Sequence, residues 1–199
     1  MSSGEERLWE VIKGLKPEDV CRRADAVFEE KTGLYRIKSF CWEISLSTRD
    51  KRISGNSPAS DTLLNRLGYF SRLSILSYLA TAKNIPLAGQ HLNPVNLKGG
   101  QLFFRGTHVL PLDKLSEKYN DTTEDFINKG IELGGERQDH GDASIMLYPL
   151  PRVPVILILW QGDNEFPPDA SILFDSTSEI HMPIDIIWSV AMMSLHIMM

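Results

Sequence analysis

The spacing of hydrophobic residues divides the chain into helical and extended segments. The strongest helical pattern runs from residue 60 to residue 83, where a broad apolar stripe follows Ser60 and Asp61, either of which can cap a helix. Shorter helical patterns occur before Gly33 and between residues 111 and 135. We therefore expect a central apolar helix, with two short helices before it and two after it.

Alternation of hydrophobic and polar residues predicts strands in two other parts of the chain. Residues 34–53 are typical of a strand pair, with Arg49-Asp50-Lys51 as the polar break. Near the end of the chain, residues 143–147, 153–160 and 171–174 are typical of three strands joined by turns that contain proline. Closely connected strands favour antiparallel pairing, so we expect an antiparallel meander here.

The last segment, residues 184–199 after Pro183, is apolar on both helical faces. A helix of this kind is expected to be covered by its own chain, and the alternative is that it docks against a second subunit. It contains Asp185 and His196, and it is shorter than the roughly 20 residues that a membrane-spanning helix needs. We therefore expect no membrane partner.

These elements together indicate an α+β fold. A chain of 199 residues is long enough for one substantial hydrophobic core and short for two. We predict a single domain over residues 1–199, in which the antiparallel meander packs against the central helix and the C-terminal helix. Residues 84–108 are rich in glycine and proline and show little periodicity, which predicts the irregular backbone that is common in functional segments.

Charge and cysteine content narrow the classes of partner. The formal net charge is -5 and no Lys/Arg cluster is longer than the Arg22-Arg23 pair, which argues against binding to nucleic acid. Residues 1–15 lack the basic region and the apolar stretch of a signal peptide, so a cytoplasmic location is expected. Cys21 and Cys41 lack the dense spacing of a disulfide scaffold and are predicted to be reduced.

The irregular segment contains the leading candidate for a ligand site. Arg105, Thr107 and His108 offer a cation, a hydroxyl and an imidazole, with several glycines nearby. Such a loop can hold a carboxylate or a phosphate by charge-assisted hydrogen bonds. The alternative is that the glycines serve turns and that Arg105 pairs with an acidic residue at the surface.

A second candidate is the turn WQGDNEFPPD, between the last two predicted strands. Asp163, Glu165 and Asp169 can bind a hard cation through oxygen. However, polar residues are also what hairpin tips ordinarily contain. Trp160 and Phe166 lie beside these acids and can form a ligand wall or contact a partner.

A third candidate combines imidazole and carboxylate groups from two segments. His140 and Asp142 lie within one stretch of five residues, QDHGD, and His181 lies four residues before Asp185. Together these groups can form a metal site, although neither pair has a recognised spacing and both are also compatible with ordinary polar turns. The sequence contains no phosphate-binding loop, dinucleotide fingerprint, HExxH, CxxC or nucleophile elbow.

Several stretches in order along the chain resemble the prokaryotic DUF3786 family. They are SILSYLATAKNIPLAG, GGQLFFRGTHVLPLDKLSEKY, the closing helix and, as the most specific part, PRVPVILILWQGDNEFPPDASILFD. The resemblance extends from about Leu63 to about Leu195, so that residues 63–195 form the core of the match and residues 1–60 match only loosely. It implies an anaerobic bacterial or archaeal setting and no particular reaction.

Some members of the family that the chain resembles carry a four-cysteine iron–sulfur module like that of corrinoid proteins. The resemblance therefore implies a setting in one-carbon or corrinoid metabolism. This chain lacks that module, and two distant cysteines cannot supply the four thiolates of a cubane cluster. No iron–sulfur cluster is expected in this chain, and no other cofactor is indicated.

Three hypotheses for function follow. The leading one is a non-catalytic accessory module that binds a small anionic or corrinoid-related ligand, or a partner protein. The second is a metal-assisted enzyme that uses His140, Asp142, His181 and Asp185 with the acidic turn. The third is a structural subunit that forms a homodimer through residues 184–199.

Overall fold

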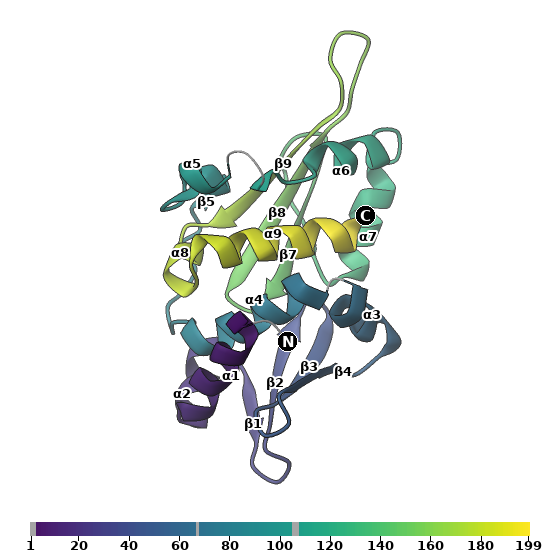
Figure 1. Cartoon of the computed structure of the whole chain (residues 1–199). Coiled ribbons are helices and arrows are strands. Elements are labelled where there is room, and N and C mark those ends of the chain that lie inside the picture. The colour runs from purple at the N-terminus through teal and green to yellow at the C-terminus, as the bar shows by residue number, and fades with distance from the viewer. Residues whose placement is uncertain (1–2, 67, 105–107) are drawn as a thin grey trace.

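The protein is built around two antiparallel β-sheets (Figure 1). The computed structural model describes residues 3–66, 68–104 and 108–199. The strand order is β1-β2-β3-β4 in the first sheet and β5-β9-β8-β7-β6 in the second. The strands are β1 (Val27–Glu29), β2 (Leu34–Ser39), β3 (Trp42–Ser47), β4 (Arg52–Gly55), β5 (His91–Leu92), β6 (Glu136–Arg137), β7 (Ala143–Leu150), β8 (Val153–Trp160) and β9 (Asp169–Asp175).

Helices pack against both sheets, and α9 crosses the second sheet in front of β7 and β8 (Figure 1). Among the described residues, no helix is both long enough and apolar enough to cross a membrane. The helices are α1 (Ser3–Gly14), α2 (Pro17–Ala24), α3 (Pro58–Arg66), α4 (Gly68–Thr81), the 3-10 helix η1 (Pro94–Asn96), α5 (Gly100–Phe103), α6 (Leu112–Tyr119), α7 (Thr123–Glu132), α8 (Ser178–His181) and α9 (Ile184–Met198).

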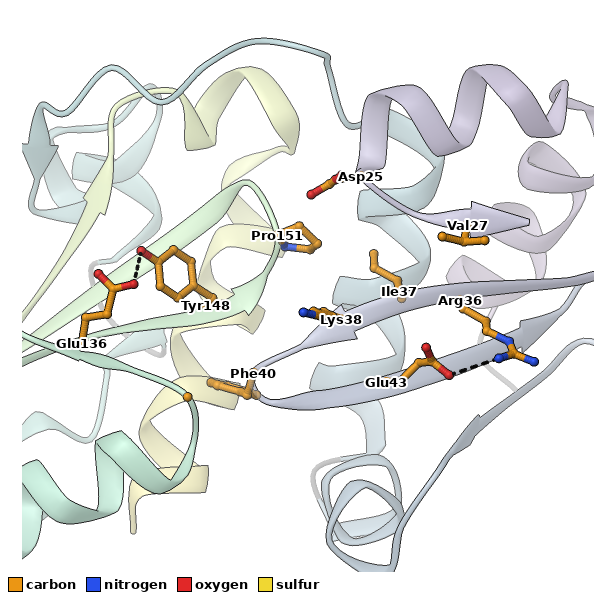
Figure 2. A pocket seen from close by; sticks show the side chains of 11 residues that line it. Asp25, Val27, Arg36, Ile37, Lys38, Phe40, Glu43, Glu136, Tyr148 and Pro151 are labelled. Atoms are coloured by element: carbon orange, nitrogen blue, oxygen red, sulfur yellow. Dashed lines mark hydrogen bonds and ion pairs between the residues drawn. The ribbon is translucent and has the colours of Figure 1, made fainter. Parts of the chain in front are cut away.

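The two sheets meet where the turn between β2 and β3 contacts β7 (Figure 2). The Phe40 N–H donates to the Tyr148 carbonyl at 2.7 Å, and Ser39 Oγ donates to the Pro149 carbonyl at 2.9 Å. The register of β7 against β8 shifts over residues 147–150. This irregularity frees the two carbonyls from the β-ladder, so that they can accept hydrogen bonds from the first sheet.

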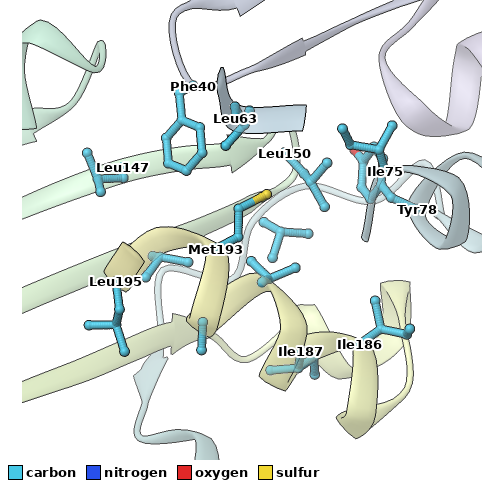
Figure 3. Close-up of a cluster of buried hydrophobic side chains, with 14 of the residues drawn as sticks. Phe40, Leu63, Ile75, Tyr78, Leu147, Leu150, Ile186, Ile187, Met193 and Leu195 are labelled. Atoms are coloured by element: carbon cyan, nitrogen blue, oxygen red, sulfur yellow. The ribbon is translucent and has the colours of Figure 1, made fainter. Parts of the chain in front are cut away.

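The hydrophobic core is continuous across both sheets and the helices between them (Figure 3). Full burial of one large apolar side chain stabilises a fold by about 1.5–3 kcal/mol. A continuous core of this kind is expected of one domain. The five largest fully buried side chains come from α1, β2, α4, α7 and β9, and are Trp9, Tyr35, Tyr78, Phe126 and Phe174.

The closing helix α9 is largely covered by its own chain, as its two apolar faces predict. Its side toward the core packs against α4 and the second sheet. Four residues spaced one turn apart are half-buried and form its outer stripe, namely Ile184, Trp188, Met192 and His196.

The predicted α+β fold with antiparallel strands is confirmed. The first sheet has two strands more than the predicted strand pair. Val27 and Phe28, expected at the end of a helix, pair with β2 and form β1, and residues 52–55 pair with β3 and form β4. The apolar stripe over residues 60–83 forms two helices, α3 and α4. The strands β5 and β6 have two residues each, too few to show the alternation from which a strand is predicted.

Candidate functional site

The leading sequence candidate is only partly described by the structure. His108 is described, whereas Arg105 and Thr107 lie outside the described residues. The His108 ring stacks on Phe103 with 4.2 Å between ring centroids and meets Trp188 edge to face at 5.3 Å. The His108 carbonyl accepts a hydrogen bond from Trp188 Nε1 at 3.1 Å. His108 is therefore held in an aromatic cluster against α9.

The acidic turn lies at the tip of a long hairpin between β8 and β9, which projects from the body of the protein (Figure 1). Asp163 Oδ1 accepts the main-chain N–H groups of Glu165 and Phe166, both at 2.8 Å. These hydrogen bonds hold the pKa of Asp163 below its usual value. The Asp163 carboxylate thus stabilises its own turn, while Trp160 and Phe166 remain 40% and 67% exposed.

The metal candidates His140 and Asp142 lie just before the start of β7. The His140 N–H donates to Ser144 Oγ at 2.9 Å, and the Asp142 carboxylate accepts the Gln161 N–H at 2.7 Å. Asp142 therefore holds the base of the hairpin that carries the acidic turn.

His181 lies near the opposite end of β7. It accepts a hydrogen bond from Lys83, and the adjacent Asn84 accepts one from Arg152, which follows the end of β7. Strand β7 has eight residues, and a rise of about 3.3 Å per residue makes it roughly 23 Å long. The structure does not bring His140 and His181 together, and it shows no group of three or more metal-binding side chains within the described ranges.

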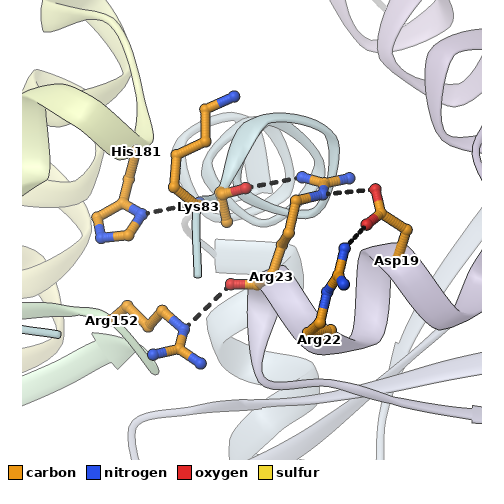
Figure 4. Close-up of polar contacts among 7 residues, drawn as sticks. Asp19, Arg22, Arg23, Lys83, Arg152 and His181 are labelled. Carbon is orange, nitrogen blue, oxygen red and sulfur yellow. Dashed lines mark hydrogen bonds and ion pairs between the residues drawn. The ribbon is translucent and has the colours of Figure 1, made fainter. Parts of the chain in front are cut away.

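A different site is built around His181, the last residue of α8, by the end of α4 and the residues that follow it. His181 is fully buried, its Nδ1 accepts the Lys83 N–H at 3.2 Å, and its carbonyl accepts Thr81 Oγ1 at 2.7 Å (Figure 4). An imidazole nitrogen that accepts a hydrogen bond carries no proton, so in the neutral ring the proton lies on Nε2. His181 Nε2 is buried and has no hydrogen-bond partner among the described residues.

Burial and nearby positive charge keep His181 neutral. Desolvation is the main cause, and the positive charges of Arg152 and Lys83 act in the same direction, whereas Asp175 opposes them. Together they lower the pKa of His181 to about 4. At neutral pH the side chain is therefore a buried hydrogen-bond donor that carries no charge.

Asp175 fixes the backbone that leads into α8. Its carboxylate is buried and accepts the Gly89 N–H at 2.7 Å, the Ala88 N–H at 3.1 Å, and the N–H and hydroxyl of Thr177 at 3.0 and 2.6 Å. Burial alone raises the pKa of Asp175, but these hydrogen bonds outweigh it, and the pKa lies below its usual value. Asp175 thus positions the segment that carries His181.

His181 lines a cavity of about 560 Å³, here called the His181 pocket. Its lining includes two exposed lysines, Lys83 and Lys98, neither of which forms an ion pair within the part of the chain that the structure describes. Glu179 also lines the pocket, and its carboxylate accepts the Lys98 N–H at 2.8 Å. The lining therefore combines two ammonium groups that have no ion-pair partner in the described residues with a histidine that carries a buried N–H donor.

The His181 pocket borders the leading sequence candidate. Gly99 and Ile184 line the pocket, and Ile184 lies one turn of α9 before Trp188, which contacts His108. Sequence reasoning included His181 but missed Lys83, Lys98 and Asp175. The run Asp-Ser-Thr-Ser at 175–178 is a recognisable turn signal, whereas nothing in the local pattern singles out either lysine.

These features define an α+β domain that carries a small, cationic pocket beside its C-terminal helix. The chain belongs to the DUF3786 family, because the sequence profile of this domain of unknown function matches residues 16–196. Comparison with curated proteins gave no match, and comparison with solved structures gave none.

Proposed function

We propose that the protein is a non-catalytic module that binds a small anion, a carboxylate or a phosphate, in the His181 pocket. The observation that carries the proposal is the buried Nε2–H of His181, which lacks an acceptor among the described residues. A buried donor without an acceptor costs about 1–3 kcal/mol. An anion oxygen placed at Nε2 removes this cost.

The charges around the pocket support an anion over a neutral or cationic ligand. Lys83 and Lys98 supply positive charge without a described carboxylate partner. Hydrogen bonds between an ammonium group and an anionic oxygen are about twice as strong as those between neutral groups. At neutral pH the His181 ring is uncharged, and its Nε2–H can still donate a hydrogen bond in a fixed direction.

A non-catalytic role is supported by the surroundings of the histidines. Within the described residues, neither His140 nor His181 has a side-chain hydrogen bond to a serine or a cysteine, the arrangement that activates a nucleophile. A setting in anaerobic one-carbon or corrinoid-related metabolism remains a prediction from the family resemblance. The metal-assisted enzyme remains the alternative hypothesis. The described residues contain no cluster of metal-binding side chains for it.

Titration calorimetry with inorganic phosphate and with acetate tests the proposal. We expect at least one of these ions to bind, and we expect Lys83→Gln and Lys98→Gln each to weaken binding about threefold to tenfold. Lys114→Gln is the matched control, because Lys114 is an exposed lysine on α6, outside the pocket. This control variant should bind as the unmodified protein does.

A second measurement locates the bound ion. In long-range proton–nitrogen spectra of the imidazoles, His181 Nε2 should carry the proton, and its signal should move when the ion binds. If neither ion shifts this signal at about 20 mM, where even ligands with a millimolar Kd are bound, no anion binds at Nε2 and the proposal is wrong.

A further inference from the structure

A second cavity lies where the two sheets meet, and it differs from the His181 pocket in location and charge (Figure 2). It has a volume of about 520 Å³, within the usual range for small-molecule sites. We call it the inter-sheet cleft. Its polar lining comes from the loop after α2, from the first sheet and from β6 and β7, and comprises Asp25, Arg36, Lys38, Glu43, Glu136 and Tyr148.

The first sheet supplies hydrogen-bond donors to the cleft. Arg36 contacts Glu29 at 2.9 Å and Glu43 at 3.6 Å through its two terminal nitrogens. Its Nε is buried and has no partner among the described residues. Lys38, two residues along β2, is exposed and forms no ion pair in the described part of the chain. The cleft therefore contains one free ammonium group and one buried N–H donor without an acceptor.

Acidic groups line the cleft as well. Glu136 on β6 has no basic partner in the described ranges, and its carboxylate accepts the Tyr148 hydroxyl at 3.3 Å. Burial and the charge of Glu136 raise the pKa of Tyr148, so the phenol keeps its proton and remains a donor. Asp25 lies just after α2 and has neither an ion pair nor a side-chain hydrogen bond within the described residues. Two carboxylates thus face a cavity that also contains unpaired donors.

We propose that the inter-sheet cleft binds a small zwitterion, a molecule of free amino-acid size with one carboxylate and one ammonium group. The ligand carboxylate binds the ammonium group of Lys38, and the ligand ammonium group binds the carboxylate of Glu136. A simple anion leaves Glu136 without a cationic partner, and a simple amine leaves Lys38 without an anionic one, so both are bound less well. This assignment is independent of the anion site at His181.

The cleft is suited to binding because its two walls are fixed to each other. Phe40 lines the cleft, is buried, and donates its N–H to the Tyr148 carbonyl at 2.7 Å. Gly134, which also lines the cleft, has a φ of +80°, and a Cβ there would lie 3.2 Å from Cys41 Cβ. Walls that are already in place lower the entropy cost of ordering a site around its ligand.

Saturation-transfer NMR with the twenty common amino acids, each at about 5 mM, tests this assignment, because a millimolar Kd gives detectable binding at that concentration. We expect at least one amino acid to bind. Its N-acetyl form lacks the ammonium group, and its amide lacks the carboxylate, so both should bind at least about tenfold more weakly. If no amino acid binds, or if the N-acetyl form binds equally well, the assignment is wrong.

Two pairs of variants locate the zwitterion. Lys38→Gln and Glu136→Gln should each weaken binding about tenfold or more, whereas Lys114→Gln and Glu117→Gln on α6 should not change it. All four residues are exposed, so the variants are expected to fold, which circular dichroism verifies. Unchanged binding in both cleft variants would overturn the assignment. The anion titrations at the His181 pocket are unaffected by either result.

Discussion

At the scale of single residues, two buried titratable groups lie close together in opposite charge states. His181 and Asp175 are both almost completely buried. His181 has no partner at Nε2 among the described residues and is neutral, whereas Asp175 accepts four hydrogen bonds and is ionised. The number of hydrogen bonds that each charged form receives, together with burial, decides the sign of each pKa shift.

His181 should make the free energy of unfolding fall as the pH is lowered below neutrality. Its pKa is about 4 in the folded protein and about 6.5 in the unfolded chain. The unfolded chain therefore binds the extra proton between pH 6.5 and pH 4, and stability is lost over that window. Between pH 7 and pH 4.5 the loss from His181 is expected to be about 2 kcal/mol. Urea unfolding at the two pH values measures it.

The His181→Asn variant tests the assignment of this loss. The amide oxygen of asparagine can replace Nδ1 as the acceptor for Lys83, and the variant lacks the titrating ring. Between pH 7 and pH 4.5, the free energy of unfolding of the variant should therefore fall by about 2 kcal/mol less than that of the unmodified protein. Because the pKa of Asp175 is lowered, the stability that Asp175 provides is lost only at more acidic pH. An unchanged slope in the variant would show that another group titrates in this window.

Asp175→Asn should destabilise the protein by about 3 kcal/mol, as expected when a buried, hydrogen-bonded charge is replaced. An amide has one acceptor oxygen, and its NH₂ group would face a main-chain N–H, so at least one of the donors around Asp175 loses its partner. Asp139→Asn is the control, since Asp139 is exposed and should change stability by less than about 0.5 kcal/mol. Equal effects of the two variants would contradict the positioning role of Asp175.

The sequence could identify His181 as a candidate but not its chemistry. Its spacing to Asp185 predicted a shared ligand role, yet Asp185 is exposed and His181 is buried. The partner that determines the tautomer of His181 is the main-chain N–H of Lys83, far away along the chain. Contacts of this kind leave no local pattern in a sequence, and the same holds for the pairing of Asp175 with Gly89.

At the scale of elements, the contact between α7 and the second sheet depends on a glycine. A Cβ at Gly130 would lie 2.3 Å from Ile145 Cγ1, so the side chain of Ile145 occupies the space over the helix. This contact brings α7 directly onto β7. A glycine within a helix usually lowers stability relative to alanine, and here close packing outweighs that cost.

Gly130→Ala is therefore expected to destabilise the protein by about 1–3 kcal/mol, the usual cost of overpacking a core. Gly14→Ala is the matched control, since Gly14 is also helical and a Cβ there has no atom within 4 Å. That control should be neutral or stabilising by up to about 1 kcal/mol. Thermal unfolding of both variants measures the difference, and a stabilising Gly130→Ala would refute the packing argument.

Long elements could be predicted from their pattern, and short ones could not. Strand β8 and helix α9 extend over many residues, so their apolar runs were sufficient to predict them. Strand β1 has three residues and depends on β2 for its pairing. Pairing with β2 therefore determines the extended conformation of this segment, for which the sequence alone predicted a helix.

At the scale of the whole molecule, Arg152 ties the second sheet to the helices around the first. It follows β7, and its Nε donates to the Arg23 carbonyl at 3.0 Å (Figure 4). Its Nη2 donates to Asn84 Oδ1 at 3.1 Å, and its main-chain N–H donates to the Tyr78 hydroxyl at 3.2 Å. The burial of Tyr78 keeps its pKa above the ordinary value, so the phenol remains protonated. One residue therefore contacts α2, α4 and the segment after α4.

Because these contacts and the core are continuous, the two sheets should unfold in one transition. Trp42 lies on β3 and Trp160 on β8, so fluorine NMR of 5-fluorotryptophan protein reports on each sheet separately during urea unfolding. We expect equal midpoints, as two-state unfolding requires. Arg152→Met should lower both midpoints together, because it lowers the free energy of unfolding by about 2–4 kcal/mol. Arg137→Met, at an exposed site on β6, should lower neither midpoint. Separate midpoints for Trp42 and Trp160 would instead show that the sheets unfold as independent units, and the inter-sheet cleft would then lie between two parts that move relative to each other.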